Sequence, residues 1–170
     1  MTEEYFFHGD LRYLEQIHAA VAVPLLRKDF MLDAYQIDEA KSFGADAVLL
    51  IAAMLDRSLM RELRQQATGL ELDSLVEVHT EKELEAAIDA GAQVIGINNR
   101  DLKTFEVSLA TTERLAPLVP AGKQAVCESG IDSLEQIRRV EKLGIHTFLI
   151  GESLMRAGEP GKKLAELLNG

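Results

Sequence analysis

The sequence predicts an α/β protein built on a parallel sheet, and three observations support this. Short apolar runs alternate strictly with segments whose apolar residues recur at helical spacing. The junction from helix to strand recurs as a glycine, a short spacer and a β-branched apolar run, in FGADAVLL (43–50), AGAQVIGI (90–97) and LGIHTFLI (143–150). Successive strands begin roughly 20–30 residues apart, which is the spacing of βα units. A closed barrel and an open doubly wound sheet both fit this pattern.

The individual elements follow from local signals. The predicted strands are apolar runs typical of a buried parallel sheet, at 23–30, 47–53, 74–79, 92–98, 124–128 and 146–150. The predicted helices carry apolar residues three and four apart, at 10–21, 33–42, 56–68, 80–90, 108–118, 133–143 and 160–168. Asp10 and Asp33 suit N-caps, Thr80 and Glu83 form a capping-box pattern, and Gly44 supplies a left-handed residue after a helix.

Composition limits the possible partners. The 170 residues suffice for one domain with a sizeable core, and we expect a single domain over 1–170. The net charge of −10 argues against nucleic acid or an anionic membrane as a partner, but not against a small anionic ligand. No run of about 18 apolar residues occurs, and the N-terminus lacks a signal-peptide pattern. We therefore expect a cytoplasmic protein, with the single cysteine, Cys127, in the core and the histidines too scattered for a metal site.

Nucleotide-binding signatures are missing from the sequence. No GxGxxG follows the first predicted strand, and no GxxxxGK[ST] occurs. Dinucleotide-binding and P-loop functions are therefore disfavoured.

Polar residues gather where the predicted strands end, in the segments RKD (27–29), EVH (77–79), NNRD (98–101), ESG (128–130) and GES (151–153). The second strand instead ends in apolar residues. Because the carboxyl ends of parallel strands converge on one crevice, we expect these groups to meet there. A lysine among two carboxylates, an amide and a guanidinium forms a plausible acid–base constellation.

Each of these residues has a structural alternative. The first predicted strand reads as buried on both faces, with Leu26 and Lys28 on one face and Arg27 and Asp29 on the other. Lys28 is then either a functional group or one partner of an ion pair. Glu77 is either an ion-pair partner of Lys28 or a catalytic base, and Glu128 poses the same choice.

Two glycine-led turns suggest a phosphate site. Gly130 and Gly151 each precede a helical segment in the last two βα units, where backbone N–H groups suit an anion. Arg100, at the end of the fourth strand, could add a charged clamp. His79, at the start of a loop, fits a helix-start residue better than a catalyst.

These motifs together resemble the indole-3-glycerol phosphate synthase family. The matching stretches are LRKDF (26–30), YQIDEA (35–40), GADAVLLI (44–51), LVEVH (75–79), IGINNRDLKTFEV (95–107), ESGI (128–131) and LIGESLMRAGEPG (149–161). The resemblance implies a TIM barrel of the phosphate-binding type. It also implies ring closure, decarboxylation and dehydration of 1-(2-carboxyphenylamino)-1-deoxyribulose 5-phosphate, without a metal or an organic cofactor. INNRDLKTFEV disfavours a related barrel such as phosphoribosylanthranilate isomerase.

The resemblance also implies roles for particular residues. Lys28 corresponds to the general acid, Glu77 to the base and Asn98 to a substrate-holding asparagine. The pair that orients the substrate corresponds to Glu128 and Ser129. The phosphate site corresponds to Arg100, Gly130, Gly151 and Glu152, the last two through backbone N–H groups. Apolar neighbours of the substrate's aromatic ring correspond to Phe30 and Leu102.

The resemblance covers only barrel strands three to eight. The family's first two strands, with a second essential lysine and a glutamate, have no counterpart here. Six strands cannot close a barrel of this geometry, and they leave two exposed edges. We therefore expect a fragment of a longer enzyme, a chain that needs a complementing N-terminal segment, or a self-associating chain. The alternative function is that of a non-catalytic partial barrel that binds a phosphorylated ligand.

Overall fold

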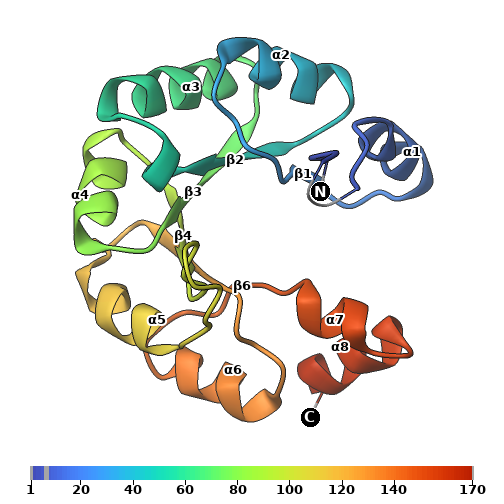
Figure 1. The fold of residues 1–170 in the computed structure, drawn as a ribbon, viewed down its shortest axis with the longest axis vertical. Coiled ribbons are helices and arrows are strands. Elements are labelled where there is room, and N and C mark those ends of the chain that lie inside the picture. The colour runs from blue at the N-terminus through green and yellow to red at the C-terminus, as the bar shows by residue number, and fades with distance from the viewer. Residues whose placement is uncertain (1, 6–7, 170) are drawn as a thin grey trace. The chain divides into compact units, whose positions relative to one another are not determined.

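The computed structural model describes residues 2–5 and 8–169 and shows an α/β fold (Figure 1). The strands are β1 (Leu26–Arg27), β2 (Ala47–Ile51), β3 (Asp73–Val78), β4 (Val94–Asn98), β5 (Gln124–Glu128) and β6 (Phe148–Leu149). They form one sheet in chain order, and the pairs β1–β2, β2–β3 and β5–β6 are parallel. The alternation of strands and helices predicted from the sequence is confirmed.

Helices separate the strands. The α-helices are α1 (Arg12–Ala20), α2 (Ala34–Ser42), α3 (Arg57–Gly69), α4 (Glu81–Asp89), α5 (Ala110–Leu115), α6 (Leu134–Glu141), α7 (Glu152–Arg156) and α8 (Pro160–Asn169). Two 3₁₀ turns, η1 (Ala52–Met54) and η2 (Ala116–Leu118), follow β2 and α5. The predicted helix 108–118 is thus divided, and Pro117 in η2 lacks the N–H that an α-helix would need there. No described helix is long and apolar enough to cross a membrane.

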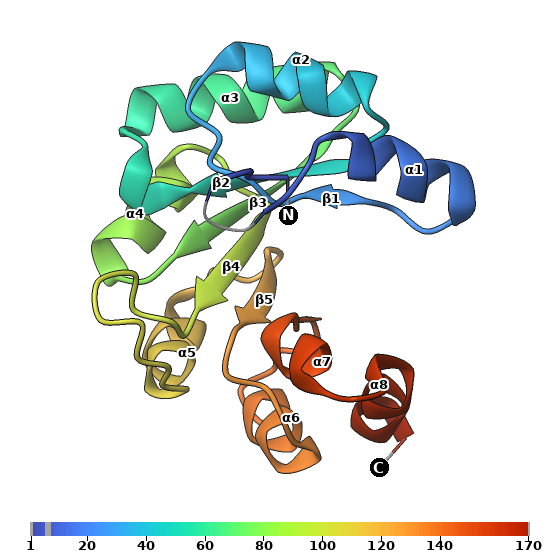
Figure 2. The same cartoon turned by 45° about the vertical axis from the view of Figure 1, so that its right-hand side comes forward.

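The chain divides into two compact units. The first comprises Met1–Glu77 and Glu85–Val94, and the second comprises Val78–Leu84 and Ile95–Gly170. The assignment of all 170 residues to one domain stays a prediction. In the first unit, α2 and α3 run side by side along one face of β1 and β2 (Figure 2). In the second unit, α7 packs against α8, and α6 also contacts α8.

The first strand differs from its prediction. β1 has only two residues, Val23 is 64% exposed, and the buried residue is Arg27. The interpretation of residues 23–30 as a strand buried on both faces was therefore wrong for most of its length. Among the described strands, β1 pairs with β2 alone. Pro24 has no N–H to donate, and the Leu25 N–H bonds the Asp46 carboxylate. β6, at the other end of the strand order, is equally short.

Capping side chains hold three of the turns from strand to helix. In the turns before α2 and α6, Gln36 and Gln136 accept two backbone N–H groups each, at 2.7 and 3.1 Å. Before α4, Glu83 accepts the His79 N–H at 2.7 Å, and Thr80 accepts the Glu83 N–H at 3.2 Å. The predicted Thr80–Glu83 pair therefore caps this helix, although Glu83 reaches one residue further back than the capping-box pattern requires.

Candidate active site

Lys28 and Glu77 lie together in the first unit. Lys28 directly follows β1, Glu77 is the penultimate residue of β3, and Nζ of Lys28 is 3.5 Å from Oε2 of Glu77. The Glu77 side chain is 2% exposed and the Lys28 side chain 29% exposed. A buried carboxylate therefore faces an ammonium group that solvent or a ligand can reach. This is the ion pair that the sequence allowed, and it places a proton donor beside a proton acceptor.

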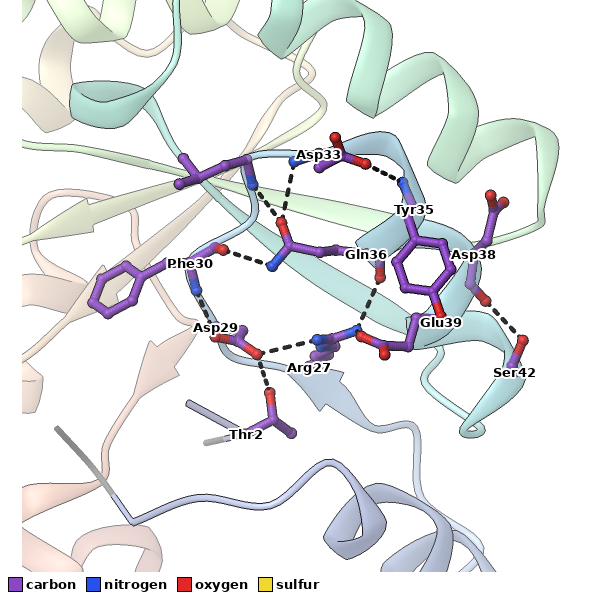
Figure 3. Close-up of polar contacts among 11 residues, drawn as sticks. Thr2, Arg27, Asp29, Phe30, Asp33, Tyr35, Gln36, Asp38, Glu39 and Ser42 are labelled. Carbon is purple, nitrogen blue, oxygen red and sulfur yellow. Dashed lines mark hydrogen bonds and ion pairs between the residues drawn. The ribbon is translucent and has the colours of Figure 1, made fainter. Parts of the chain in front are cut away.

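A buried arginine holds the segment that carries Lys28 (Figure 3). The Arg27 guanidinium lies 3.2 Å from Asp29 and 2.9 Å from Glu39, and it donates to the Gln36 carbonyl at 2.9 Å. Arg27 and Asp29 flank Lys28 in sequence and contact each other. The backbone on both sides of Lys28 is thus tied to α2.

The next residues are held by Gln36 (Figure 3). Its Nε2 donates to the Phe30 carbonyl at 2.9 Å, while its Oε1 accepts the N–H groups of Leu32 and Asp33. The Phe30 ring points away from this network. One buried charge and one amide therefore order the whole turn between β1 and α2.

In the second unit, Asn98 ends β4 and Arg100 begins a compact turn. The Asn98 carboxamide oxygen accepts the Arg100 N–H at 3.0 Å, and Arg100 pairs with Val107 in an antiparallel bridge. Asp101 accepts the N–H groups of Lys103 and Thr104, and these bonds hold the pKa of its carboxyl below the ordinary value. Leu102, on this turn, is 42% exposed.

Arg100 meets Glu152, although 52 residues separate them in sequence. The Arg100 guanidinium forms an ion pair with the Glu152 carboxylate and donates to the Phe105 carbonyl at 3.2 Å. Glu152 also pairs with Arg156 at 2.7 Å. Two of the residues expected at a phosphate site are thus neighbours, and an anion that bound Arg100 would compete with Glu152.

The turn after β5 has an unusual backbone. Glu128, the last residue of β5, is 1% exposed, and the next two residues adopt positive φ, 62° at Ser129 and 77° at Gly130. A Cβ atom on Gly130 would lie 2.8 Å from Cγ1 of Val107. Gly130 therefore serves both the backbone conformation and a close approach, which is a stronger reason for glycine than a helix start alone.

A cavity of about 370 Å³ lies beside this turn, between α5 and α6. Its lining includes Ser108, Gly130, Asp132 and Arg139. Arg139 pairs with Glu113 at 2.6 Å, and this guanidinium holds the pKa of Glu113 below its ordinary value. The cavity therefore has a mixed polar lining whose cation is already paired.

The predicted site residues divide between the two units. Lys28, Phe30 and Glu77 belong to the first unit, and the rest belong to the second, namely Asn98, Arg100, Leu102, Glu128, Ser129, Gly130, Gly151 and Glu152. The structure brings together Lys28 with Glu77, Asn98 with Arg100, and Arg100 with Glu152. That all of the predicted site residues converge on one crevice stays a prediction.

Three residues that shape this site were missed from the sequence. Arg27 and Gln36 order the turn around Lys28, and Asn99 bonds to the turn after β5. A charged residue inside a predicted buried strand was the available signal for Arg27. The Asn98–Asn99 doublet after an apolar strand was the signal for Asn99.

Comparison with known proteins gives consistent matches. A family described as "Indole-3-glycerol phosphate synthase" matches residues 1–167. The indole-3-glycerol phosphate synthase of Chromobacterium violaceum is 50% identical over 167 residues, which are 98% of this chain and 63% of that protein. That of Alkaliphilus metalliredigens is 49% identical over 170 residues, which are 100% of this chain and 65% of that protein. The chain therefore spans less than two thirds of the length of these relatives.

Solved structures with low sequence identity share the fold. The 3-hexulose-6-phosphate synthase of Salmonella typhimurium superposes with a TM-score of 0.81 at 13% identity, over 96% of this chain and 80% of that chain. The 3-keto-L-gulonate-6-phosphate decarboxylase of Vibrio cholerae gives 0.74 at 20% identity, over 95% of this chain and 78% of that chain. These likenesses show a fold of the TIM-barrel type, of which the described residues form six βα units.

Proposed function

Because the chain belongs to the indole-3-glycerol phosphate synthase family, we propose that it carries the family's carboxy-lyase chemistry in tryptophan biosynthesis. The reaction converts 1-(2-carboxyphenylamino)-1-deoxyribulose 5-phosphate to indole-3-glycerol phosphate, CO₂ and water. The observation that carries the proposal is the Lys28–Glu77 pair, a partly exposed ammonium group 3.5 Å from a buried carboxylate. It supplies an acid and a base at the carboxyl ends of two parallel strands, where TIM-barrel enzymes hold their substrates.

Lys28 and Glu77 divide the proton transfers. Ring closure joins the carboxyl-bearing ring carbon to the ketone carbon of the substrate, and the carboxylate leaves as CO₂. As the ring closes, the ketone oxygen takes up one proton from solvent and becomes a hydroxyl group. This hydroxyl must then leave as water, and Lys28 donates the second proton, which makes it a good leaving group. Glu77 accepts the proton that must depart when the indole double bond forms. The Arg27 and Gln36 contacts keep the Lys28 segment in place during both steps.

The second unit supplies the binding groups. Arg100 and the backbone N–H groups of Gly130, Gly151 and Glu152 hold the phosphate. Asn98, Glu128 and Ser129 hold and orient the sugar portion, while Phe30 and Leu102 contact the aromatic ring. Phosphate binding requires Arg100 to exchange its ion pair with Glu152 for one with the phosphate, since one guanidinium serves both. The ligand is thus a small phosphorylated molecule rather than a nucleic acid or a membrane.

The chain needs a complementing segment in this proposal. It covers 63–65% of the relatives' length, and the residues that the structure describes form six strands where a closed barrel of this type has eight. A segment with two further strands and a lysine would complete the barrel. The competing arrangement is self-association of the chain through the edges of its sheet. A cytoplasmic location stays a prediction from composition.

Indole fluorescence provides the test. The chain is assayed with the substrate, alone and mixed with the N-terminal remainder of the Chromobacterium violaceum relative. We expect turnover in the mixture, its loss in Lys28→Ala and Glu77→Gln, and normal turnover in Lys82→Ala, which removes an exposed lysine from α4. Turnover that survives both site variants would refute the assigned roles. Phosphate binding without any turnover, in either sample, would favour the non-catalytic partial barrel.

A further inference from the structure

We propose that Asn99 is the positioning residue that sets the conformation of residues 128–130, and that it thereby aims the Gly130 N–H at the phosphate. The inference rests on the proposed function for the identity of the ligand. The arrangement around Asn99 comes from the second unit alone.

The Asn99 carboxamide is buried and fully engaged. Asn99 is 2% exposed, and its Nδ2 donates to the carbonyls of Glu128 at 3.0 Å and Ser129 at 3.1 Å. Its Oδ1 accepts two bonds from Thr112, from the N–H at 3.0 Å and from the hydroxyl at 2.8 Å. Both Nδ2 hydrogens and both Oδ1 lone pairs therefore have partners. A carboxamide satisfies this arrangement, whereas a carboxylate lacks the two donors.

The two Nδ2 bonds reach the strained part of the turn. Ser129 has a φ of 62°, a conformation that costs a non-glycine residue about 1–2 kcal/mol and persists only where the surroundings hold it. Through its hydrogen bonds to the carbonyls of Glu128 and Ser129, Asn99 holds the peptide groups on both sides of Ser129 in place. Asn99 is thus the side chain placed to maintain this conformation.

The geometry of the peptide bond links these two hydrogen bonds to the direction of the N–H group that would bind the phosphate. In a trans peptide, the carbonyl and the following N–H point in opposite directions, and the chain has no cis peptide bond among the described residues. Fixing the Ser129 carbonyl toward Asn99 therefore aims the Gly130 N–H away from Asn99. In the same way, the Glu128 carbonyl fixes the Ser129 N–H, which donates to the Leu149 carbonyl at 3.4 Å. Asn99 does not touch the phosphate in this proposal but determines which way a phosphate-binding group points.

The two ends of the carboxamide allow a matched experiment. Asn99→Asp keeps the shape and the acceptor for Thr112 but loses both Nδ2 bonds to the turn. The backbone N–H of Asn99 still donates to the Glu128 carbonyl at 2.9 Å, so the bond to the Ser129 carbonyl is the one without a substitute. Thr112→Val removes one donor from the opposite end and leaves the turn contacts unchanged. Thr112 is 0% exposed, so both variants disturb buried hydrogen bonds and lower stability. Only Asn99→Asp removes the bonds that orient the Gly130 N–H.

The readout is inorganic phosphate binding, titrated by ³¹P NMR with the full 170-residue chain. We expect Asn99→Asp to weaken binding about tenfold or more, and Thr112→Val to change it less than about twofold. With the complemented enzyme, Asn99→Asp should raise KM more than it lowers kcat. Asn99→Ser, which introduces no charge, serves where Asn99→Asp does not fold. Hydrogen exchange supplies an independent measurement, since phosphate should slow exchange at Gly130 in the unmodified chain.

Several results would overturn the proposal. These are equal weakening of binding by the Asn99 and Thr112 variants, unchanged binding in the Asn99 variants, and no effect of phosphate on Gly130 exchange. Phosphate binding that shows the predicted Asn99 dependence without synthase turnover would support the positioning role and refute the proposed function. The two failures are therefore distinguishable.

Discussion

Gly130→Ala tests whether the turn after β5 requires a residue without a side chain at this position. A Cβ atom at this position would meet Cγ1 of Val107 at 2.8 Å, and the φ of 77° is unfavourable for alanine. Gly144 is the matched control in the same unit. Its φ is 82°, and nothing lies within 4 Å of the corresponding Cβ position. Both variants share the backbone strain, but only the first makes the contact.

The expected magnitudes follow from the shared backbone strain and from the one contact that differs. Placing alanine at positive φ costs about 1–2 kcal/mol at either position. The reduced entropy of the unfolded chain offsets about 0.4–1 kcal/mol of this cost, equally in both variants. The contact with Val107 adds about 1–3 kcal/mol of overpacking. Val107 is 41% exposed and can move, so we expect a value near the lower end, about 1 kcal/mol.

Urea unfolding followed by circular dichroism measures the difference. Gly130→Ala should lower the free energy of unfolding by about 1 kcal/mol more than Gly144→Ala. When Val107→Ala is added to Gly130→Ala, the free energy of unfolding should rise again by that difference, because the second substitution removes the methyl group that the new Cβ meets. The reasoning is refuted if the two glycine variants are equally stable, or if Val107→Ala does not recover the difference.

Three further predictions concern other parts of the chain. Arg27→Leu should lower the free energy of unfolding by about 2–3 kcal/mol in urea titrations, because it leaves Asp29 and Glu39 without their buried partner; an effect below about 1 kcal/mol would contradict this. Burial would raise the pKa of Glu83, yet bonds from His79 and Thr80 hold it below the ordinary value. Glu83 therefore stabilises the fold at pH values above the pKa of its carboxyl in the unfolded chain, and this stabilisation is lost as the pH falls through the pKa of the same carboxyl in the folded chain. Glu83→Gln should accordingly reduce the loss of stability in acid titrations. Burial raises the pKa of the Cys127 thiol, so a thiol reagent should label it slowly at neutral pH and readily in urea; rapid native labelling would show that the thiol is accessible.

Local sequence signals predicted the elements well where a single segment determines them. β5 was predicted with the bounds that the structure shows, and Asp33 caps α2 through its side chain as expected. Gly44 adopts the predicted positive φ. In each case the physical cause lies within a few residues of the element, as an apolar run, a capping side chain or a helix-ending glycine.

The contacts that shape the site were harder to predict because their partners lie far away in sequence. Arg100 pairs with Glu152 across 52 residues, and Asn99 bonds Thr112 across 13 and Ser129 across 30. Strand-end position predicted Arg100 as a candidate site residue but could not identify Glu152 as its counter-charge. Asn99 looks like any polar residue after a strand, and only its neighbours in the fold distinguish it from Asn98.

The capping side chains bear directly on whether the chain can be complemented. Gln36, Glu83 and Gln136 hold the turns after β1, β3 and β5 through bonds that each span three or four residues. Such short-range bonds form without any contribution from strands outside the chain. The turns after β1, β3 and β5, the first of which carries the proposed acid and the last Gly130, are therefore ordered by this chain's own residues. A complementing segment would need to supply strands and its lysine, but not the conformation of these turns, and this makes activity in the mixed sample the physically expected outcome.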